Sequence, residues 1–523
     1  MIDLPACPTP IRFVHRGRVV VLNDVAPTRT ILQWLREQAG SLDTKEGCAE
    51  GDCGACSVIV AELDDAPETT LAGSVLRRDG LRLRPVNACI RFLPTLDGKA
   101  LLTVADLSDA DGALHPAQQA LIHNHGSQCG FCTPGFAVHL ALAHECARCT
   151  GTTPTREELA NALAGNLCRC TGYRPILDAG QRMGPLSGAD LPLDGLREQL
   201  QQLQALAASP AKAHTDATPP AWQAPRSLAE LAKARQRWPQ ARLLAGGTDL
   251  GLSVTKQLRD LGPLIWLGAV PELRHLGSSP DGWLEVGAGV TLEDGWSALA
   301  AHWPELTPMW KRFAGPPVRH AGTLVGNVAN GSPIGDSAPV LIALGARLRL
   351  RRGEALREVA LEDFQTGYQR NRLEPGEFIE ALRVPLPAAG GIDPAAGWRL
   401  RAWKLSKRHD CDISTLSAAL ALRIDAVSNR IDAVRLAFGG MAATVRRATQ
   451  AEATLLGAAP ADESALKAAC AALNQDFQPI DDLRASASYR RRAAAGLLRR
   501  FWLETCRDVP ASALRVFDSE GPL

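Results

Sequence analysis

Four cysteines near the start of the chain have a spacing that suits a binuclear iron–sulfur centre. Cys48, Cys53 and Cys56 lie in KEGCAEGDCGACSV, and Cys89 follows in VNACI. Three thiolates from one loop and a fourth from a distant segment form the ligand pattern of a plant-type [2Fe–2S] cluster. A structural zinc site is the alternative, but such sites usually have closely spaced ligands in both halves, which the solitary Cys89 does not match.

The loop that carries the first three cysteines also contains Gly47, Gly51 and Gly54. A loop that wraps an inorganic cluster needs positive φ angles and close backbone approach, which glycine allows. Backbone N–H groups can then point at sulfur and tune the reduction potential. The chain has 14 cysteines, 11 of them before residue 171. Because intracellular thiols stay reduced, this clustering favours metal ligation over disulfides.

A second group of cysteines forms two short pairs. Cys129 and Cys132 lie in SQCGFCTPGF, and Cys168 and Cys170 lie in GNLCRCTGYRP. Each pair adjoins a helical segment, so two helix ends can bring four thiolates to one site. Spacing alone leaves zinc open as an alternative to a second cluster.

Two glycine-rich segments further along the chain suit a phosphate-bearing cofactor. LLAGGTDLG (243–251) follows a strand-like run, and such a turn can hold a pyrophosphate with backbone N–H groups. It lacks the G-x-G-x-x-G fingerprint, so a structural turn remains the alternative. Residues 313–346 are rich in Gly, Asn, Ser and Pro between apolar runs, which predicts a partly buried loop. A threaded cofactor tail would satisfy the backbone polar groups of such a loop.

The elements that position these residues follow from periodicity and turn signals. Residues 11–22 predict a hairpin, and TRTILQWLREQAG predicts a helix with Thr28 or Thr30 as its cap and Gly40 as its stop. A strand follows at SVIVAEL, and AVRLAFGGM predicts a later one. Helices are predicted in PAQQALIHNHG, GFAVHLALAHECAR, TREELANALAGNL, RPILDAGQRMG and LREQLQQLQALAA. A linker is predicted in SPAKAHTDATPPAWQAP, which is rich in Ala, Pro and Thr. The residues after it show first an α/β and then an α+β pattern of strands and helices.

Composition excludes several classes of protein. The 523 residues carry 57 basic and 56 acidic side chains, a net charge of +1, and show no uninterrupted apolar run long enough for a membrane span. We therefore expect no nucleic-acid or membrane partner. The N-terminus lacks a secretory pattern, so a soluble, cytoplasmic protein is expected.

The cysteine motifs KEGCAEGDCGAC, QCGFCTPG and GNLCRCTGY together resemble the iron–sulfur half of the xanthine dehydrogenase and aldehyde oxidase family of molybdenum hydroxylases. LLAGGTDLG and the segment 313–346 resemble the FAD domain of that family. KRHDCDIS and FGGMAATVRRA extend the resemblance over nearly the whole chain. It implies two [2Fe–2S] clusters, the second held by Cys129, Cys132, Cys168 and Cys170, and one bound FAD.

The resemblance implies a multidomain α+β fold. Its parts are a β-grasp, ferredoxin-like 2Fe-2S domain (1–98), a four-helix 2Fe-2S domain (99–185), a linker (186–220), an α/β FAD-binding domain of the PCMH/VAO-like type (221–392) and an α+β C-terminal domain like that of the CO dehydrogenase flavoprotein (393–515).

The implied FAD contacts lie in both glycine-rich segments and beyond them. Residues 243–250 would wrap the pyrophosphate, and Phe313 would pack near the isoalloxazine. One departure from the family is that Val325 stands where a second glycine is usual before Asn327. The full set is Leu243, Leu244, Ala245, Gly246, Gly247, Thr248, Asp249, Leu250, Phe313, Thr323, Leu324, Val325, Gly326, Asn327, Asp336, Ile379 and Lys404.

Single members of this set have simpler interpretations. Asp336 follows a glycine and precedes a serine, the context of an Asx-turn, and Phe313 on an apolar segment suits a core position. Cys146 and Cys149 suit packed or incidental thiols, and His123 and His125 suit solvated or core histidines.

The expected function is electron transfer within a larger enzyme. No catalytic residue beyond the FAD site is expected on this chain, and the molybdopterin cofactor would lie on a large partner subunit, two copies of each chain forming a heterotetramer. Hypoxanthine or xanthine would be oxidised there, and electrons would pass through the helical-domain cluster, the ferredoxin-type cluster and FAD to NAD. Alternatives are another molybdenum hydroxylase that oxidises aldehydes or N-heterocycles, and a free-standing electron carrier or redox sensor. The sequence lacks a basic patch or DNA-binding helix pair for a DNA-binding sensor.

Overall fold

The computed structural model describes residues 7–64, 70–71, 75–207, 219–507 and 509–514. Residues 1–6, 65–69 and 72–74 of the predicted first domain, 208–218 of the predicted linker, and 508 and 515 of the predicted last domain lie outside these ranges. The chain forms two compact units. The first comprises residues 1–271, 291–293 and 314–323, and the second comprises residues 272–290, 294–313 and 324–523.

The first unit begins with a seven-stranded sheet in the order β2-β1-β7-β3-β6-β5-β4. The predicted hairpin is present as the antiparallel pair β1 and β2, and β7 runs parallel to β1 and antiparallel to β3. The bounds are β1 Ile11–His15, β2 Arg18–Leu22, β3 Ser57–Leu63, β4 Thr70–Leu71, β5 Val75–Arg78, β6 Leu81–Asn87 and β7 Ala100–Leu102.

Helix α1 (Ile31–Glu37) packs its apolar side against this sheet. The Thr30 side chain accepts a hydrogen bond from the Gln33 amide, and the Gln33 side chain returns one to the Thr30 amide, so a capping box fixes the start of the helix. Trp34 meets Phe13 edge to face, with ring centroids 4.9 Å apart. Residues 38–56, between α1 and β3, form the loop that carries three of the predicted ligands.

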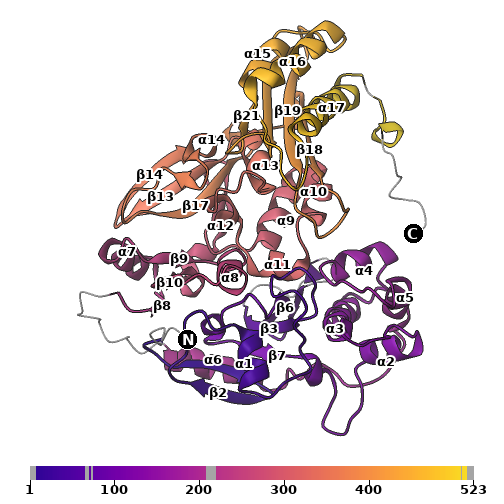
Figure 1. The fold of residues 1–523 in the computed structure, drawn as a ribbon, viewed down its shortest axis with the longest axis vertical. Helices are drawn as coiled ribbons and strands as arrows, with labels where there is room; N and C mark the ends of the chain where they lie inside the picture. The colour runs from indigo at the N-terminus through magenta and orange to yellow at the C-terminus, as the bar shows by residue number, and fades with distance from the viewer. Residues whose placement is uncertain (1–6, 65–69, 72–74, 208–218, 508, 515–523) are drawn as a thin grey trace. The chain divides into compact units, whose positions relative to one another are not determined.

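Four helices follow the sheet and lie together as one bundle (Figure 1). They are α2 (Pro116–His123), α3 (Thr133–Thr150), α4 (Arg156–Leu163) and α5 (Arg174–Arg182). The bundle shares a hydrophobic core with the sheet, since Phe136 and Leu140 of α3 and Ile59 of β3 belong to the same buried cluster. The next helix, α6 (Leu196–Ala207), returns to the sheet and buries Leu196, Leu200 and Leu203 in that core.

The first unit also contains a small parallel sheet in the order β8-β10-β9, with helices α7 and α8 between its strands. Its aromatic residues Trp222 and Trp266 stack with ring centroids 5.8 Å apart. The bounds are β8 Trp222–Gln223, α7 Leu228–Arg237, β9 Arg242–Leu244, α8 Leu250–Thr255 and β10 Leu264–Trp266.

The second unit contains an antiparallel five-stranded sheet in the order β11-β12-β17-β13-β14 and a two-stranded sheet of β15 and β16. The strands are β11 Leu276–Ser278, β12 Trp283–Gly287, β13 Arg347–Arg352, β14 Ala355–Ala360, β15 Gln365–Gly367, β16 Arg370–Asn371 and β17 Phe378–Pro385. The helices of this region are α9 Leu292–His302, α10 Thr307–Lys311, α12 Leu324–Ala329, α13 Ser337–Leu344 and α14 Leu361–Phe364.

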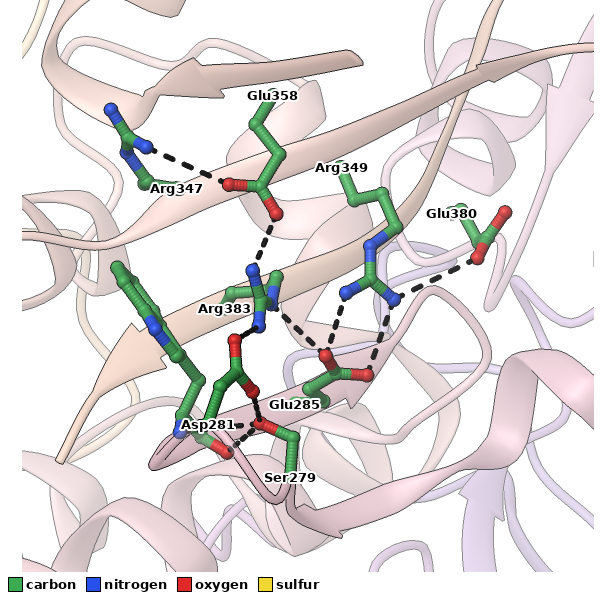
Figure 2. Close-up of polar contacts among 9 residues, drawn as sticks. Ser279, Asp281, Glu285, Arg347, Arg349, Glu358, Glu380 and Arg383 are labelled. Atoms are coloured by element: carbon green, nitrogen blue, oxygen red, sulfur yellow. Dashed lines mark hydrogen bonds and ion pairs between the residues drawn. The ribbon is translucent and has the colours of Figure 1, made fainter. Parts of the chain in front are cut away.

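A charge network crosses one face of the five-stranded sheet (Figure 2). The Arg383 guanidinium contacts three carboxylates: Asp281 at 2.5 Å, Glu358 at 2.6 Å and Glu285 at 3.0 Å. Arg349 forms a two-point contact with Glu285, at 2.7 and 3.2 Å. Alternate positions on neighbouring strands share a face, so these pairs tie β12, β17, β13 and β14 together across the sheet.

The last part of the second unit is an antiparallel sheet in the order β18-β19-β20-β21, packed with three helices around one core (Figure 1). Phe438 of the sheet meets Phe477 at 5.5 Å between ring centroids, and Phe501 and Trp502 of α17 are buried in the same cluster. The bounds are β18 Trp398–Leu405, β19 Leu416–Asp425, β20 Arg430–Gly439, β21 Arg446–Arg447, α15 Thr449–Leu455, α16 Glu463–Asp476 and α17 Ala487–Cys506.

The prediction of a loop at residues 313–346 was wrong, because most of this segment is helical. It contains α11 (Pro316–Ala321), α12 and α13. Prolines occupy the first turn of α11, where the missing N–H costs nothing, and α13 is apolar on all sides and buried. Tertiary burial therefore stabilises helices too short to form alone. In the part of the chain described, no helix combines the length and apolarity that crossing a bilayer requires.

Candidate redox sites

The four cysteines of the first predicted set lie together in the first unit. Cys48 contacts Cys53 and Cys89, and Cys89 contacts Cys56. Cys56 and Cys89 are buried, whereas Cys48 and Cys53 are half-buried. The contacts with Cys53 and Cys89 hold the pKa of the Cys48 thiol far below its ordinary value, so Cys48 is the thiol that most readily becomes a thiolate.

Backbone amides surround the Cys48 sulfur. The N–H groups of Glu50, Asp52 and Cys53 all point at Cys48 Sγ, each with a nitrogen–sulfur distance of 3.4 Å. The loop achieves this with left-handed backbone at Ala49 (φ +54°), Gly51 (φ +78°) and Gly54 (φ +72°). Amide dipoles aimed at sulfur stabilise negative charge there, as the ligands of an iron–sulfur cluster require.

The second set meets in two pairs at the helix ends of the bundle. Cys129 and Cys170 are exposed, with their sulfur atoms 3.4 Å apart, and Cys132 contacts Cys168 in the buried pair. Burial raises the pKa of Cys132 to about 12. Hydrogen bonds from the Cys129 backbone, the Thr171 side chain and the Cys129 side chain lower the pKa of the Cys170 thiol to about 6.

The thiol chemistry fits a binuclear cluster. Across the described ranges, no group of three or more His, Cys, Asp and Glu side chains is arranged to hold a metal ion. The thiols of each set nevertheless lie in contact, and four thiols from two segments are the donor set of a [2Fe–2S] core.

The two cysteine loops are in direct contact with each other. The Leu167 amide donates a 3.0 Å hydrogen bond to the Cys53 carbonyl, which joins the first loop to the residue before Cys168. A Cβ atom at Gly54 would lie 2.4 Å from the Gly165 carbonyl oxygen, and one at Gly135 would lie 2.3 Å from the Gly54 carbonyl oxygen. Only glycine permits this approach, so the loops interlock.

The glycine turn after β9 is equally crowded. A Cβ at Gly246 would lie 1.8 Å from the Ala321 carbonyl oxygen, and Gly247 has φ +76°. Thr248 Oγ would lie 3.1 Å from a Cβ at Gly322, whereas Asp249 is exposed. The turn from Leu243 to Leu250, with Leu244 buried and Ala245 half-buried, thus presents backbone rather than side chains, as a pyrophosphate cradle requires.

A buried polar group in the second unit includes two of the predicted flavin residues. The Asp336 carboxylate accepts hydrogen bonds from Lys404 Nζ at 2.8 Å and from Ser414 Oγ at 2.5 Å. Asp336 makes no capping bond to α13, so the Asx-turn interpretation is wrong. Asn327 Oδ1 is buried without a hydrogen-bond partner in the described residues and would lie 3.8 Å from a Cβ at Gly335. An orphaned polar atom here fits a polar cofactor group.

The remaining predicted flavin residues are mainly buried. Phe313 packs on Trp296, with ring centroids 5.9 Å apart, and Ile379 pairs with Leu350 in the β17–β13 ladder. Ile379 lies on β17, whereas Asp336 stands at the start of α13. Thr323 bridges to Thr291, and Leu324, Val325 and Gly326 lie on α12, where the Val325 side chain is buried.

The other cysteines and histidines singled out from the sequence, Cys146, Cys149, His123 and His125, lie on or beside helices α2 and α3. Cys146 is buried on α3 and contacts the Val75 carbonyl at 3.4 Å, and burial raises its thiol pKa to about 12. Cys149 is exposed. His123 ends α2 and His125 follows it with φ +53°.

Two residues beside the predicted sites, Ser414 and Thr255, carry no signal of their role in the sequence. Ser414 completes the Asp336 group, and Thr255 of α8 bonds the Ala49 carbonyl at 2.7 Å in the first cysteine loop. Each partner is far away in the chain, so no local pattern announces the contact. Ser414 is the last residue of KRHDCDIS, a segment noted in the sequence only for its resemblance to the family.

Four family models match the chain in succession. They describe a 2Fe-2S iron–sulfur cluster binding domain at residues 14–92, a [2Fe-2S] binding domain at 103–181, the FAD binding domain in molybdopterin dehydrogenase at 214–387 and the CO dehydrogenase flavoprotein C-terminal domain at 401–505. This order is the small-subunit layout of one family. The chain belongs to the xanthine dehydrogenase and molybdenum hydroxylase family.

Similar proteins of this family include a xanthine dehydrogenase of Emericella nidulans, 32% identical over 96% of this chain and 39% of that protein. Aldehyde oxidase 2 of Cavia porcellus is 29% identical over 95% of this chain and 40% of that protein. The chain thus spans about two fifths of the length of these curated relatives. A chain of carbon monoxide dehydrogenase from Hydrogenophaga pseudoflava matches with a TM-score of 0.50 and 29% identity, over 56% of this chain and 99% of that one.

The predicted fold class is confirmed. This molybdenum hydroxylase family member is a multidomain α+β protein with two 2Fe-2S domains, an FAD-binding domain and a C-terminal flavoprotein domain. These domains are those of the electron-transfer FAD and 2Fe-2S unit of the family.

Proposed function

We propose that the chain is the electron-transfer subunit of a xanthine dehydrogenase. A larger partner subunit holds the molybdenum cofactor and oxidises hypoxanthine or xanthine, and NAD is the final electron acceptor. Two copies of each chain form a heterotetramer in the cytoplasm. The xanthine dehydrogenase relatives support this substrate class, because one is 32% identical over 96% of the chain.

One observation carries the electron-transfer role. Two sets of four cysteines lie in one unit, and their loops are joined by the bond from the Leu167 amide to the Cys53 carbonyl at 3.0 Å. We assign Cys48, Cys53, Cys56 and Cys89 to one cluster and Cys129, Cys132, Cys168 and Cys170 to the other. When bound, the clusters supply one-electron chemistry and FAD pairs electrons for NAD.

The chain's own residues hold these groups. In the first site, three amides support the Cys48 thiolate. In the first unit, the backbone of the turn 243–250 is the proposed contact for the FAD pyrophosphate. In the second unit, the Asn327 and Asp336 side chains are proposed polar contacts for FAD. Phe313, Thr323 to Gly326, Ile379 and Lys404 complete the proposed FAD contacts.

The complex isolated with its molybdenum-containing partner tests this proposal. We expect about four irons per FAD and NAD reduction that depends on hypoxanthine or xanthine. Cys168→Ser should prevent substrate from reducing FAD while the partner's molybdenum is still reduced. Cys149→Ser, which alters an exposed thiol on the same bundle, is the matched control. Normal turnover of the Cys168→Ser complex would contradict the ligand assignment.

A second candidate is a hydroxylase for another substrate, such as an aldehyde, an N-heterocycle or carbon monoxide. The similarities to aldehyde oxidase 2 and to a carbon monoxide dehydrogenase chain favour it. Rates with a panel of purines, aldehydes, N-heterocycles and carbon monoxide distinguish the two. A purine rate well below the best of the others would replace xanthine dehydrogenase with this candidate.

A further inference from the structure

Helix α8 connects the proposed FAD turn to the first cysteine loop. It begins at Leu250, the last residue of the turn 243–250, and contacts residues next to two cysteines of the first set within the first unit. Thr255 Oγ donates to the Ala49 carbonyl at 2.7 Å. A Cβ at Gly251 would lie 2.3 Å from the Ile90 carbonyl oxygen, beside Cys89. The helix therefore touches the backbone next to two of the four proposed ligands.

The hydroxyl of Thr255 favours the distant partner. A threonine in a helix commonly bonds the carbonyl four residues earlier, and Thr255 Oγ lies 3.1 Å from that oxygen, on Gly251. The Ala49 oxygen, at 2.7 Å from Thr255 Oγ, is 0.4 Å closer than the Gly251 oxygen. The nearby ion pair of Lys256 and Glu50 spans 3.8 Å between exposed side chains and adds little. The hydroxyl is thus the specific polar link from α8 to the loop.

The bonded carbonyl belongs to the peptide that points at Cys48. Ala49 C=O and Glu50 N–H form one planar unit, and in a trans peptide they point in opposite directions. Thr255 holds the oxygen, while the Glu50 amide faces Cys48 Sγ at 3.4 Å. Ala49 has φ +54°, a conformation that non-glycine residues seldom adopt without support. A fixed oxygen therefore means a fixed N–H···S bond.

We propose that Thr255 is a positioning residue that orients the Ala49–Glu50 peptide and thereby raises the reduction potential of the first cluster. The inference rests on the proposed function, since it requires a cluster at Cys48, Cys53, Cys56 and Cys89. An N–H group directed at a thiolate stabilises the more negative, reduced cluster. Without the Thr255 hydroxyl the peptide can rotate, and the reduced state loses that stabilisation.

Redox titration of the holoprotein, followed by electron paramagnetic resonance of each reduced cluster, tests the proposal. Thr255→Val keeps the shape of the side chain and removes the hydroxyl, so the first cluster should shift to lower potential while the second cluster stays unchanged. Thr255→Ser should restore the wild-type value. Ser253→Ala, on the same short helix, is the control and should leave both potentials unchanged.

The outcomes separate this inference from the proposed function. Wild-type protein without iron would reject the proposed function itself. Wild-type protein with two clusters, together with an unshifted Thr255→Val variant or an equal shift in Ser253→Ala, would overturn the role of Thr255. Selective loss of the first cluster from Thr255→Val, with FAD and the second cluster retained, supports it. Loss of both clusters and FAD overturns it, because α8 would then be a general packing element.

Discussion

Acid should weaken the helical bundle through His139, a buried histidine that is held neutral. His139 lies on α3, and its Nδ1 is 2.8 Å from the Ala162 carbonyl oxygen on α4. A carbonyl only accepts, so Nδ1 must carry the hydrogen. Nε2 is buried with no hydrogen-bond partner in the described residues. Burial lowers the pKa of His139 to about 4, because an imidazolium here would lack both water and a counter-charge.

The size of the effect follows from the two pKa values. In the unfolded chain the histidine titrates near its model value of 6.5. The stabilisation is therefore complete above pH 6.5 and is lost progressively as the pH falls towards about 4. Between pH 7.5 and pH 5, His139 alone should reduce the free energy of unfolding of the bundle by about 2 kcal/mol.

His139→Gln tests this value, because an amide can donate to the Ala162 carbonyl but does not titrate in this range. Urea unfolding at pH 7.5 and pH 5, read by pulsed hydrogen exchange of peptides from α3 and α4, gives the local stability. We expect the acid-induced loss to be about 2 kcal/mol smaller in the variant than in the wild type. His123→Gln at the exposed end of α2 is the control. An identical loss in His139→Gln and wild type would refute the assignment.

Two further substitutions address the second unit. Arg383→Met removes the cation shared by three carboxylates and should lower the free energy of unfolding, measured in urea, by about 2 kcal/mol. The control Arg352→Met removes an exposed ion pair and should change the free energy of unfolding by less than about 0.5 kcal/mol. Equal effects of the two substitutions would contradict the network. Lys404→Met leaves the Asp336 carboxylate buried without its cation, a cost of about 3 kcal/mol, so FAD content should fall while iron content stays constant. Full FAD retention in Lys404→Met, or equal loss in the exposed Lys407→Met control, would remove Lys404 from the site.

Local sequence signals predicted the elements best where one interaction dominates. The strand SVIVAEL matches β3, Ser57–Leu63, because β-branched and apolar residues form a buried central strand. The sequence predicted the helix cap at Thr28 or Thr30, and the structure has it at Thr30, whose capping partner Gln33 is only three residues away. The segment 313–346 was predicted as a loop because its glycines and asparagines suggest turns. Burial of Leu324 and Val328, and of every residue of α13 except Ala338, makes most of it helical instead.

The sites show the same division. The structure brings the thiols of each predicted set into contact, although Cys89 is 33 residues from Cys56 and Cys168 is 36 residues from Cys132. The pairing of Asp336 with Lys404 and Ser414 spans 68 and 78 residues, and the Thr255 bond to Ala49 spans 206. No periodicity encodes such contacts, because the fold alone brings these segments together.

The interlocked glycines of the two cysteine loops have a consequence for biogenesis. A side chain at Gly54 would collide with the Gly165 carbonyl, and one at Gly135, in the first turn of α3, would collide with the Gly54 carbonyl, so the two segments fix each other's shape. We expect metal binding at one proposed site to order its loop and thereby organise the neighbouring loop, so that loading of the two proposed sites is coupled. The modules should therefore mature as a single piece, and splitting the gene between them would separate each half from the surface that shapes it.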